Sequence, residues 1–187
     1  VLRKSLTDYT KKFSSSGLDA MILLCEVDDP SKFGVAYIDK EDSLKIKSII
    51  EKPKNPTSNL AVIGVYFLTP KIFDIIDNLK PSSRGELEIT DALQLLMDKG
   101  NKIAYDIVTG WWKDTGTPED IIHANRLVLD SIGTDEQFLA EKDVSIKGNI
   151  IIGNNTDVSH DSSIIGPAII GKNCKIRNAV RLGPYVS

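Results

Sequence analysis

The sequence is poor in cysteine, in histidine and in net charge. Its two cysteines, Cys25 and Cys174, lie far apart inside apolar runs, without CxxC spacing or histidine partners. This arrangement argues against a disulfide scaffold or a zinc site and predicts two buried, reduced thiols in a cytosolic protein. The 23 basic and 26 acidic residues leave a net charge of −3. We therefore expect neither a nucleic-acid partner nor an anionic membrane surface as a partner.

Long apolar runs are also absent, since no run approaches the roughly 20 residues that a membrane span needs. We therefore expect a soluble, cytoplasmic protein. The 187 residues suffice for one medium domain and a small second one. The chain begins with the letters VLRK, with neither an initiator methionine nor the apolar core of a signal peptide. This beginning leads us to expect that the sequence is a piece of a longer protein.

Residues 1–133 alternate between amphipathic and β-rich segments, at the spacing typical of α/β folds. The clearest helix start is Thr117-Pro118, where a hydroxyl N-cap precedes a proline and two acids. The polar residues 39–42 are expected to turn two strands into a hairpin. Helices are predicted over 7–16, 70–79, 89–98 and 118–131, and strands over 20–27, 35–38, 44–51 and 61–68. In the second helix, one face is expected to carry Ile72, Phe73, Ile75, Ile76 and Leu79.

From about Asp143 a period of six residues replaces the helical period. Aliphatic side chains lead the hexads, and a second register of mostly small residues lies four positions further on. The leading positions are Ile146, Ile152, Val158, Ile164, Ile170, Ile176 and Leu182, and the second register is Ile150, Thr156, Ser162, Ala168, Cys174, Val180 and Val186. This pattern resembles the hexapeptide repeat of left-handed parallel β-helices, in which three hexads complete one coil and the leading side chains point inward. A chance run of β-hairpins is the alternative.

Four short motifs occur in a fixed order before the repeat. They are EKP at 51–53, AVIGVY at 61–66, RGELEITD at 84–91 and WKDTGTP at 112–118. Together they resemble the second half of the sugar-1-phosphate nucleotidyltransferases, most of all the glucose-1-phosphate thymidylyltransferases. The resemblance covers about residues 19–130. It implies an α/β fold, with the C-terminal portion of a Rossmann-like nucleotidyltransferase domain over 1–133 and a truncated left-handed parallel β-helix over 143–187.

The family's reaction joins a sugar 1-phosphate to a nucleoside triphosphate and releases pyrophosphate. Because both reactants are anionic, this chemistry depends on charge neutralisation and alignment by Mg²⁺ and cationic side chains. The resemblance implies Asp114 as one Mg²⁺ ligand and Lys52 as a cation near the sugar phosphate. Taken without the family, Asp114 is a turn aspartate that caps Gly116, and Lys52 is a solvated lysine at a strand end.

The resemblance also implies a set of sugar-binding residues. Glu51 would accept hydrogen bonds from sugar hydroxyls, and Gly34 would let the backbone approach the sugar. Val62 would contribute backbone groups, Tyr66 a ring or hydroxyl, and Arg84 a cation near the sugar-phosphate end. Taken alone, Glu51 is a charge partner of a neighbouring lysine, Gly34 is a bulge or strand start, and Val62 and Tyr66 are core residues.

Two parts of the family's site have no counterpart in these 187 residues. One is the glycine-rich GxGTRL loop that holds the triphosphate, and the other is a second metal-binding aspartate. We therefore expect the chain as given to be an inactive fragment without the nucleotide half of its site. The sequence leaves open whether the nucleotide is dTTP, UTP or GTP, and whether the sugar is glucose, N-acetylglucosamine or mannose. An unpaired edge on an unfinished β-helix favours a homo-oligomer.

Other functions remain open at this stage. A UTP- or GTP-dependent member would be an N-acetylglucosamine-1-phosphate uridylyltransferase or a mannose-1-phosphate guanylyltransferase. A second alternative is a non-catalytic regulatory or assembly subunit that keeps the sugar pocket. A third is a hexapeptide acyltransferase, for which His160 is the candidate base, although we expect both His123 and His160 to be structural or exposed.

Overall fold

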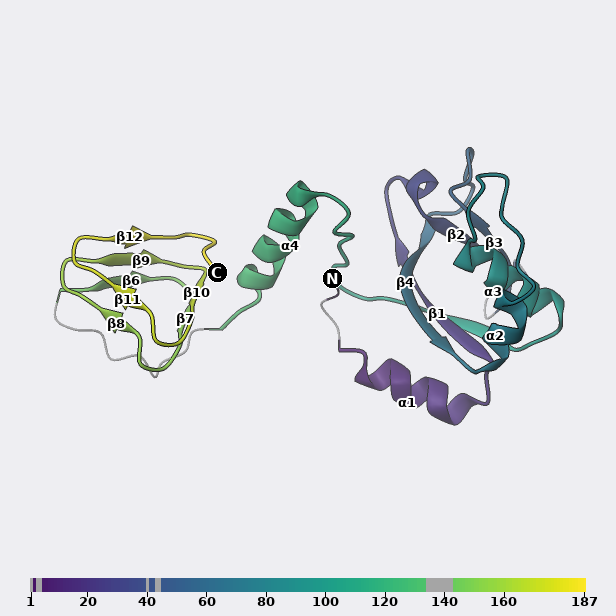
Figure 1. Cartoon of the computed structure of the whole chain (residues 1–187), viewed down its shortest axis with the longest axis horizontal. Helices are drawn as coiled ribbons and strands as arrows, with labels where there is room; N and C mark the ends of the chain where they lie inside the picture. Colours follow the sequence, from purple (N-terminus) through teal and green to yellow (C-terminus); the bar gives the residue numbers. More distant parts are fainter. Residues whose placement is uncertain (1, 3–4, 40, 43–44, 134–142) are drawn as a thin grey trace. The chain divides into compact units, whose positions relative to one another are not determined.

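The computed structural model describes every residue except 1, 3–4, 40, 43–44 and 134–142, and it divides the chain into two compact units (Figure 1). We call Leu2–Trp112 the sheet unit and Lys113–Ser187 the repeat unit. The division lies earlier than the domain boundary predicted between 133 and 143. Helix α4 (Pro118–Asp130) belongs to the repeat unit, where Asn125 Oδ1 accepts a hydrogen bond from the Ser187 hydroxyl at 3.0 Å.

The sheet unit is built on a mixed five-stranded sheet with the strand order β3-β2-β4-β1-β5. Its strands are β1 (Ala20–Glu26), β2 (Gly34–Ile38), β3 (Ile46–Glu51), β4 (Leu60–Leu68) and β5 (Ile103–Ile107). β5 runs parallel to β1, and the other neighbours are antiparallel. The predicted hairpin is present as β2 and β3, although residues 40 and 44 of the predicted turn and strand lie outside the described residues. Strand β5 was not predicted.

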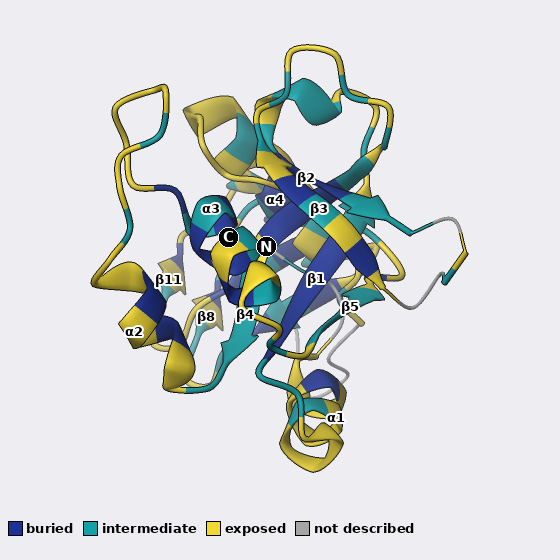
Figure 2. Ribbon diagram, turned by 90° about the vertical axis from the view of Figure 1, so that its right-hand side faces the viewer, coloured by how far each residue is buried: buried dark blue, intermediate teal, exposed yellow. Residues whose placement is uncertain are grey.

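Helices cover both faces of this sheet (Figures 1 and 2). The helices of the unit are α1 (Thr7–Ser16), α2 (Lys71–Ile76) and α3 (Ile89–Asp98), with a short 3-10 helix at Pro30–Lys32. Successive side chains of β1 point to opposite faces. Ile22 packs in a core with α2 and α3, whereas Leu23 packs in a second core with Tyr9 of α1. β1 is therefore buried on both faces, which fits its continuous apolar run.

Helix α2 differs from its prediction, which placed five apolar side chains on one face of a helix over 70–79. The helix ends at Ile76, and it buries Ile72 and Ile75, whereas Phe73 is 64% exposed. Successive helical residues are about 100° apart, so Phe73 lies off the stripe that faces the core. Ile76 is also exposed, at 38%. The prediction for this helix was therefore wrong in its length and for Phe73 and Ile76.

The repeat unit contains three small parallel sheets after α4. Its strands are β6 (Ser145–Lys147), β7 (Ile150–Ile152), β8 (Asp157–Val158), β9 (Ser163–Ile165), β10 (Ala168–Ile170), β11 (Lys175–Ile176) and β12 (Arg181–Leu182). The sheets are β6-β9-β12, β7-β10 and β8-β11. Equivalent residues in neighbouring turns of the chain, such as Asn155 and Asn173, are 18 positions apart. Three hexads therefore bring the chain back beside itself.

The leading aliphatic positions form the core of the repeat unit, in which Ile164 is fully buried. Ile146 is the exception, because it is 37% exposed in β6 and has one paired strand, β9, beside it. The expectation of an inward Ile146 is therefore wrong among the described residues. In the second register, the Ser162 hydroxyl donates to Arg177 O at 2.9 Å and accepts from Val180 N at 3.4 Å. Ser162 thus forms hydrogen bonds with backbone groups of the next turn.

Both cysteines are free thiols and half-buried rather than fully buried. Burial raises the pKa of the Cys25 thiol, and the neighbouring charge of Glu26 adds to that rise. A raised thiol pKa makes the reactive thiolate scarcer at neutral pH. None of the described helices combines the length and the apolar character that crossing a membrane requires.

Candidate functional site

Three of the predicted sugar-binding residues are brought together by strand pairing. Gly34 opens β2 and pairs with Glu51, the last residue of β3. Val62 lies on β4, opposite Leu24 near the carboxyl end of β1. A Cβ atom placed on Gly34 would lie 3.0 Å from Glu51 Oε2 and 3.6 Å from Val62 Cβ. The cluster thus lies beside the carboxyl end of β1, where open α/β sheets bind ligands.

Glu51 is held by α3 rather than by a neighbouring lysine. The hydroxyl of Thr90 donates a hydrogen bond to Glu51 Oε2 at 3.1 Å. Thr90 is the second residue of α3, so the carboxylate lies near a helix N-terminus, where negative charge is favoured. Within the described part of the chain, Glu51 forms no ion pair with Lys52 or Lys54. The charge-pair alternative for Glu51 is therefore not what the structure contains.

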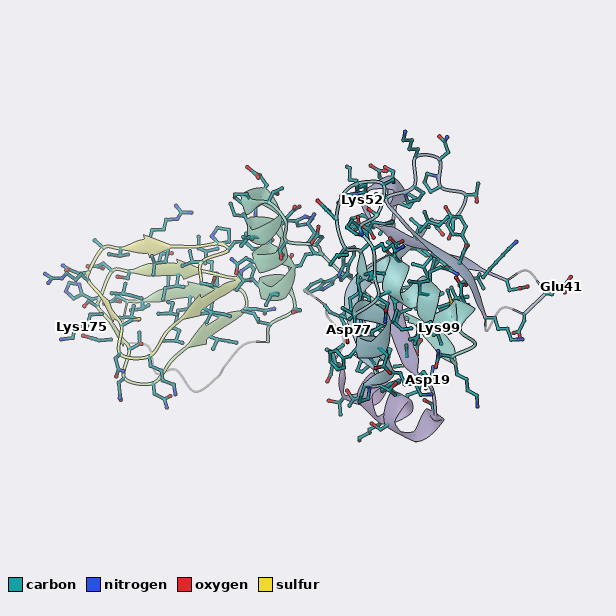
Figure 3. The ribbon with its side chains drawn as sticks, turned by 45° about the vertical axis from the view of Figure 1, so that its right-hand side comes forward. Asp19, Glu41, Lys52, Asp77, Lys99 and Lys175 are labelled. Carbon is teal, nitrogen blue, oxygen red and sulfur yellow. The ribbon has the colours of Figure 1, made fainter. Side chains whose placement is uncertain are left out.

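Lys52 follows Glu51 directly and has an uncommon backbone conformation. Its φ angle is 41°, in the left-handed region that residues other than glycine seldom adopt. Its backbone N–H donates to Phe33 O at 2.9 Å, which ties the end of β3 to the start of β2. The side chain is exposed at the end of the sheet unit remote from Asp19 (Figure 3). An exposed ammonium beside Glu51 suits both the phosphate-binding interpretation and the solvated one.

Tyr66 is half-buried on β4 and packs against the core on the α2 and α3 side of the sheet. Burial raises the pKa of its phenol, and the negative charge of Glu51 raises it further. Both effects disfavour the phenolate. Tyr66 therefore remains a neutral hydroxyl close enough to Glu51 to respond to its charge.

Arg84 has acidic partners within its own loop. Its Nη2 lies 3.3 Å from Glu86 Oε2, and its Nε lies 3.2 Å from Glu88 Oε1. Glu88 also accepts a hydrogen bond from the Ser82 hydroxyl at 3.3 Å. Glu86 and Glu88 thus order the loop before α3. A phosphate that binds Arg84 would compete with two carboxylates for the guanidinium.

Asp114 belongs to the repeat unit, whereas the other six predicted site residues belong to the sheet unit. Its carboxylate is exposed and makes no hydrogen bond or ion pair with the described residues. The capping bond to Gly116 is therefore absent, although a Cβ on Gly116 would lie 3.4 Å from Asp114 Oδ2. No three potential ligand side chains cluster around a metal site in the described ranges. A single free carboxylate fits Mg²⁺, which keeps several waters and takes its other ligands from phosphates.

Comparisons with known proteins identify the family of this chain. The profile described as "Nucleotidyl transferase" matches residues 1–131. The chain belongs to the nucleotidyl transferase family. A low-salt glycan biosynthesis nucleotidyltransferase, Agl11 of Haloferax volcanii, is 40% identical over all 187 residues, which cover 52% of that protein. A glucose-1-phosphate thymidylyltransferase of Streptomyces antibioticus is 41% identical over 90% of this chain and 46% of its own length.

Solved structures show the same fold in part. A glucose-1-phosphate thymidylyltransferase structure from Bacillus anthracis in complex with sucrose has a TM-score of 0.62 and 40% identity, over 73% of this chain and 54% of that one. A UDP-glucose pyrophosphorylase complexed with UDP-glucose has a TM-score of 0.59 and 33% identity, over 67% of this chain and 49% of that one. This nucleotidyl transferase chain therefore spans about half the length of the relatives it matches.

One member of the cluster was not predicted from the sequence. Thr90 lies inside the motif at 84–91, but the sequence analysis did not assign it to the site. The available signal was its place in the first turn of a predicted helix, where the backbone N–H groups have no partner within the helix. Its hydrogen bond to Glu51, which is 39 residues earlier, and the position of its methyl group beside Gly34 show that it belongs there.

Proposed function

We propose that this chain forms the sugar 1-phosphate side of an enzyme that joins a sugar 1-phosphate to a nucleoside triphosphate and releases pyrophosphate. The observation that carries the proposal is the convergence of Gly34, Glu51 and Val62, with Glu51 held by the Thr90 hydroxyl. The missing side chain of Gly34 leaves room for Thr90, whose hydroxyl orients the Glu51 carboxylate. An oriented carboxylate accepts hydrogen bonds from a ligand that donates them, as a sugar does. The neighbouring Lys52 supplies positive charge for a phosphate.

In this proposal each residue has a limited task. Glu51 accepts a hydrogen bond from a sugar hydroxyl, and Lys52 neutralises the sugar phosphate. Tyr66 stays protonated and contributes a ring face or a hydroxyl at the border of the sugar. Arg84 gives the loop before α3 its shape, and it adds positive charge at the phosphate end when its acidic partners release it.

Asp114 is the residue that would hold Mg²⁺ together with the substrate phosphates. When bound, the ion would supply charge neutralisation between two anionic reactants. The Asp114 carboxylate is available for this task, because it makes no hydrogen bond or ion pair with the described residues, and Asp114 stands between Lys113 and the N-cap of α4. The missing glycine-rich loop leaves the nucleotide without its binding groups in these 187 residues.

Glucose 1-phosphate and dTTP are the proposed substrates, because two thymidylyltransferases of Streptomyces are 41% and 36% identical to this chain. A uridylyl transfer is the second candidate. A bifunctional protein GlmU of Methanococcus aeolicus is 45% identical over 74% of the chain, and a UDP-glucose pyrophosphorylase shares the fold. In this proposal the described residues bind the sugar phosphate, so they do not determine which of these nucleotides is the substrate.

We further propose that the strands β6 to β12 form a left-handed parallel β-helix built from hexapeptide repeats. Support comes from the three parallel sheets, from the spacing of 18 residues between equivalent positions and from the buried leading aliphatics. Residues with positive φ recur at Asn155, Asp161, Asn173, Ala179 and Tyr185, where the chain turns a corner. The exposed edge strands of such a stack favour a homo-oligomer.

Direct binding tests the sugar site without requiring turnover. The 187-residue chain is titrated with glucose 1-phosphate by calorimetry, and glucose 6-phosphate and inorganic phosphate serve as comparison ligands. We expect saturable binding that Glu51→Gln weakens, because the amide is a poorer acceptor than a carboxylate. Glu41→Gln is the matched control, since Glu41 is an exposed glutamate of the same unit, drawn well away from Lys52 in Figure 3. Absent binding, or equal effects of both variants, would contradict the proposed site.

A further inference from the structure

Thr90 is almost completely buried, with 1% of its surface exposed, although it stands at the border of the candidate sugar site. Its hydroxyl has one partner among the described residues, Glu51 Oε2 at 3.1 Å. That contact occupies one oxygen of the carboxylate. The second oxygen, Oε1, has no hydrogen-bond partner in the part of the chain that the structure describes, so Glu51 keeps one acceptor atom for a ligand.

The other branch of Thr90 packs against Gly34. A Cβ atom added to Gly34 would lie 2.6 Å from Thr90 Cγ2 and 3.0 Å from Glu51 Oε2. The methyl and the hydroxyl of Thr90 therefore contact different residues of the same cluster. A β-branched side chain has few χ1 rotamers, so packing of the methyl on the glycine also fixes the direction of the hydroxyl.

This arrangement restricts the Glu51 side chain. A glutamate at the end of a strand samples several rotamers, and ordering it when a ligand binds costs conformational entropy. The bond from Thr90 orders Glu51 before a ligand arrives. A pre-ordered acceptor also distinguishes ligands better, because a hydroxyl in the wrong place leaves the acceptor unpaired.

We propose that Thr90 is a positioning residue, which fixes Glu51 so that its free oxygen accepts a hydrogen bond from one particular sugar hydroxyl. Thr90 itself does not contact the sugar. The proposal rests on the proposed function, in which Glu51 binds the sugar of a sugar 1-phosphate. It adds that recognition of that hydroxyl depends on the Thr90 hydroxyl, rather than on Glu51 alone.

The alternative is that the bond between Thr90 and Glu51 only joins α3 to the sheet. In that case, loss of the hydroxyl would lower stability and weaken all ligands to the same extent. A positioning role predicts a loss confined to ligands that carry the recognised hydroxyl. The two roles are therefore separated by the pattern of ligand affinities and not by a single affinity.

The test uses the 187-residue chain with glucose 1-phosphate and a set of its monodeoxy analogues, each lacking one hydroxyl. In the parent, removal of the recognised hydroxyl should weaken binding. Thr90→Val removes the hydroxyl of Thr90 and keeps its shape, so the penalty for that deoxy analogue should shrink by about two- to tenfold. Thr90→Ser keeps the hydroxyl and should retain the penalty.

Thr69→Val is the matched control for a threonine to valine change. Thr69 lies in the same unit, and its buried Oγ1 has no hydrogen-bond partner among the described residues. This control should leave the deoxy penalty unchanged. Thermal melting of each variant checks that the chain is folded. If Thr90→Val does not fold, Thr90→Ala gives the decisive measurement, because it also lacks the hydroxyl and adds no atoms to the site.

The outcomes separate this inference from the proposed function. If the parent does not bind glucose 1-phosphate, the proposed function fails and the inference fails with it. If the parent binds and Glu51→Gln weakens binding, but Thr90→Val keeps the full deoxy penalty, only the inference is overturned. If Thr90→Val weakens the binding of every analogue to the same extent, the inference is also overturned, and Thr90 has the structural role.

Discussion

Lys113 Nζ lies 2.6 Å from Asp120 Oδ1, which ties the residue before Asp114 to the first turn of α4. The Thr117 hydroxyl donates to the other oxygen of the same carboxylate at 2.8 Å and accepts from Asp120 N at 3.2 Å. Asp120 therefore joins the two ends of the segment from 113 to 120 through its contact with Lys113. Asp114 lies inside it as an exposed side chain with a defined backbone.

This contact predicts a pH dependence of stability. Lys113 first, and then Thr117, hold the pKa of Asp120 below its ordinary value of 3.8. A carboxyl group with a lower pKa in the folded state stabilises that state above its unfolded pKa and loses this contribution as the pH falls through the folded pKa. We expect Asp120→Asn to lower the melting temperature near pH 7, and the difference from the parent to shrink as the pH falls below 3.8.

Thermal melts of the 187-residue chain at a series of pH values provide this measurement. Glu119→Gln is the control, because it removes a first-turn charge that makes no hydrogen bond or ion pair with the described residues. It should cost less than Asp120→Asn at neutral pH. A difference between Asp120→Asn and the parent that stays constant down to about pH 2 would show that the carboxylate charge is not responsible.

The core of the repeat unit gives a second prediction. Ile164 is fully buried, and the equivalent Ile146 in β6 is 37% exposed. Replacing Ile164 by Asp should unfold the repeat strands, since an unpaired buried carboxylate costs several kcal/mol. The same change at Ile146 leaves the carboxylate partly in water and should cost clearly less. Melting followed by NMR signals of residues 145–187 compares the two, and equal losses would contradict an inward repeat.

Much of the fold was predictable because each element carries a local signal. The Thr117 cap does accept from Asp120 N, and α1 spans Thr7–Ser16, as expected. The period of six predicted the buried aliphatic positions of the repeat unit. These features depend on residues close in sequence, whose spacing alone fixes the geometry.

Strand β5 and the Thr90 contact were not predictable in the same way. β5 is held by parallel pairing with β1, for example Tyr105 with Ile22, and its sequence alternates little in burial. The site depends on contacts between β2, β3 and α3, which no local pattern encodes. The predicted residues Gly34, Glu51 and Val62 come together, but their family roles stay predictions, because a contact does not identify a ligand.

A third prediction concerns activity. The 187 residues contain no GxGTRL stretch, whose backbone amides would bind the triphosphate. We expect the isolated chain to form no sugar nucleotide from glucose 1-phosphate and dTTP, UTP or GTP, even where it binds the sugar phosphate. A coupled pyrophosphate assay checks this. Pyrophosphate release that requires both substrates, and that disappears in Asp114→Ala, would show that the chain carries a complete site.

The fourth prediction concerns Asp114 in the complete enzyme, with both halves of the site. Asp114→Asn keeps the shape of the side chain but removes the charge that would hold Mg²⁺. We expect a large fall in kcat, partly restored at higher Mg²⁺ concentration. Glu119→Gln, a nearby change at an exposed acid, should leave the Mg²⁺ dependence unchanged. Parental kinetics for Asp114→Asn at every Mg²⁺ concentration would make Asp114 a structural residue.

Substitution of Lys52 should change different kinetic constants from substitution of Asp114, because the proposed partner of Lys52 is the phosphate of the sugar rather than the metal. Lys52→Ala removes an exposed cation that follows Glu51 in the cluster. In the complete enzyme we expect kcat/KM for sugar 1-phosphate to fall. The loss should correspond to about 1.5–3 kcal/mol of transition-state stabilisation, the range for a charge-assisted hydrogen bond. The KM for the nucleoside triphosphate and the Mg²⁺ dependence should change little.

The matched control for Lys52 is Lys54→Ala, because Lys54 is an exposed lysine of the same loop. A general loss of positive charge around the loop would affect both variants, with a shared dependence on salt. A specific phosphate contact affects Lys52→Ala alone, and it also reduces the preference for glucose 1-phosphate over unphosphorylated glucose. Steady-state kinetics with the sugar phosphate varied at saturating triphosphate separate these cases. If Lys52→Ala and Lys54→Ala behave alike, Lys52 is the solvated strand-end lysine, and the phosphate must be bound elsewhere, with Arg84 the next candidate.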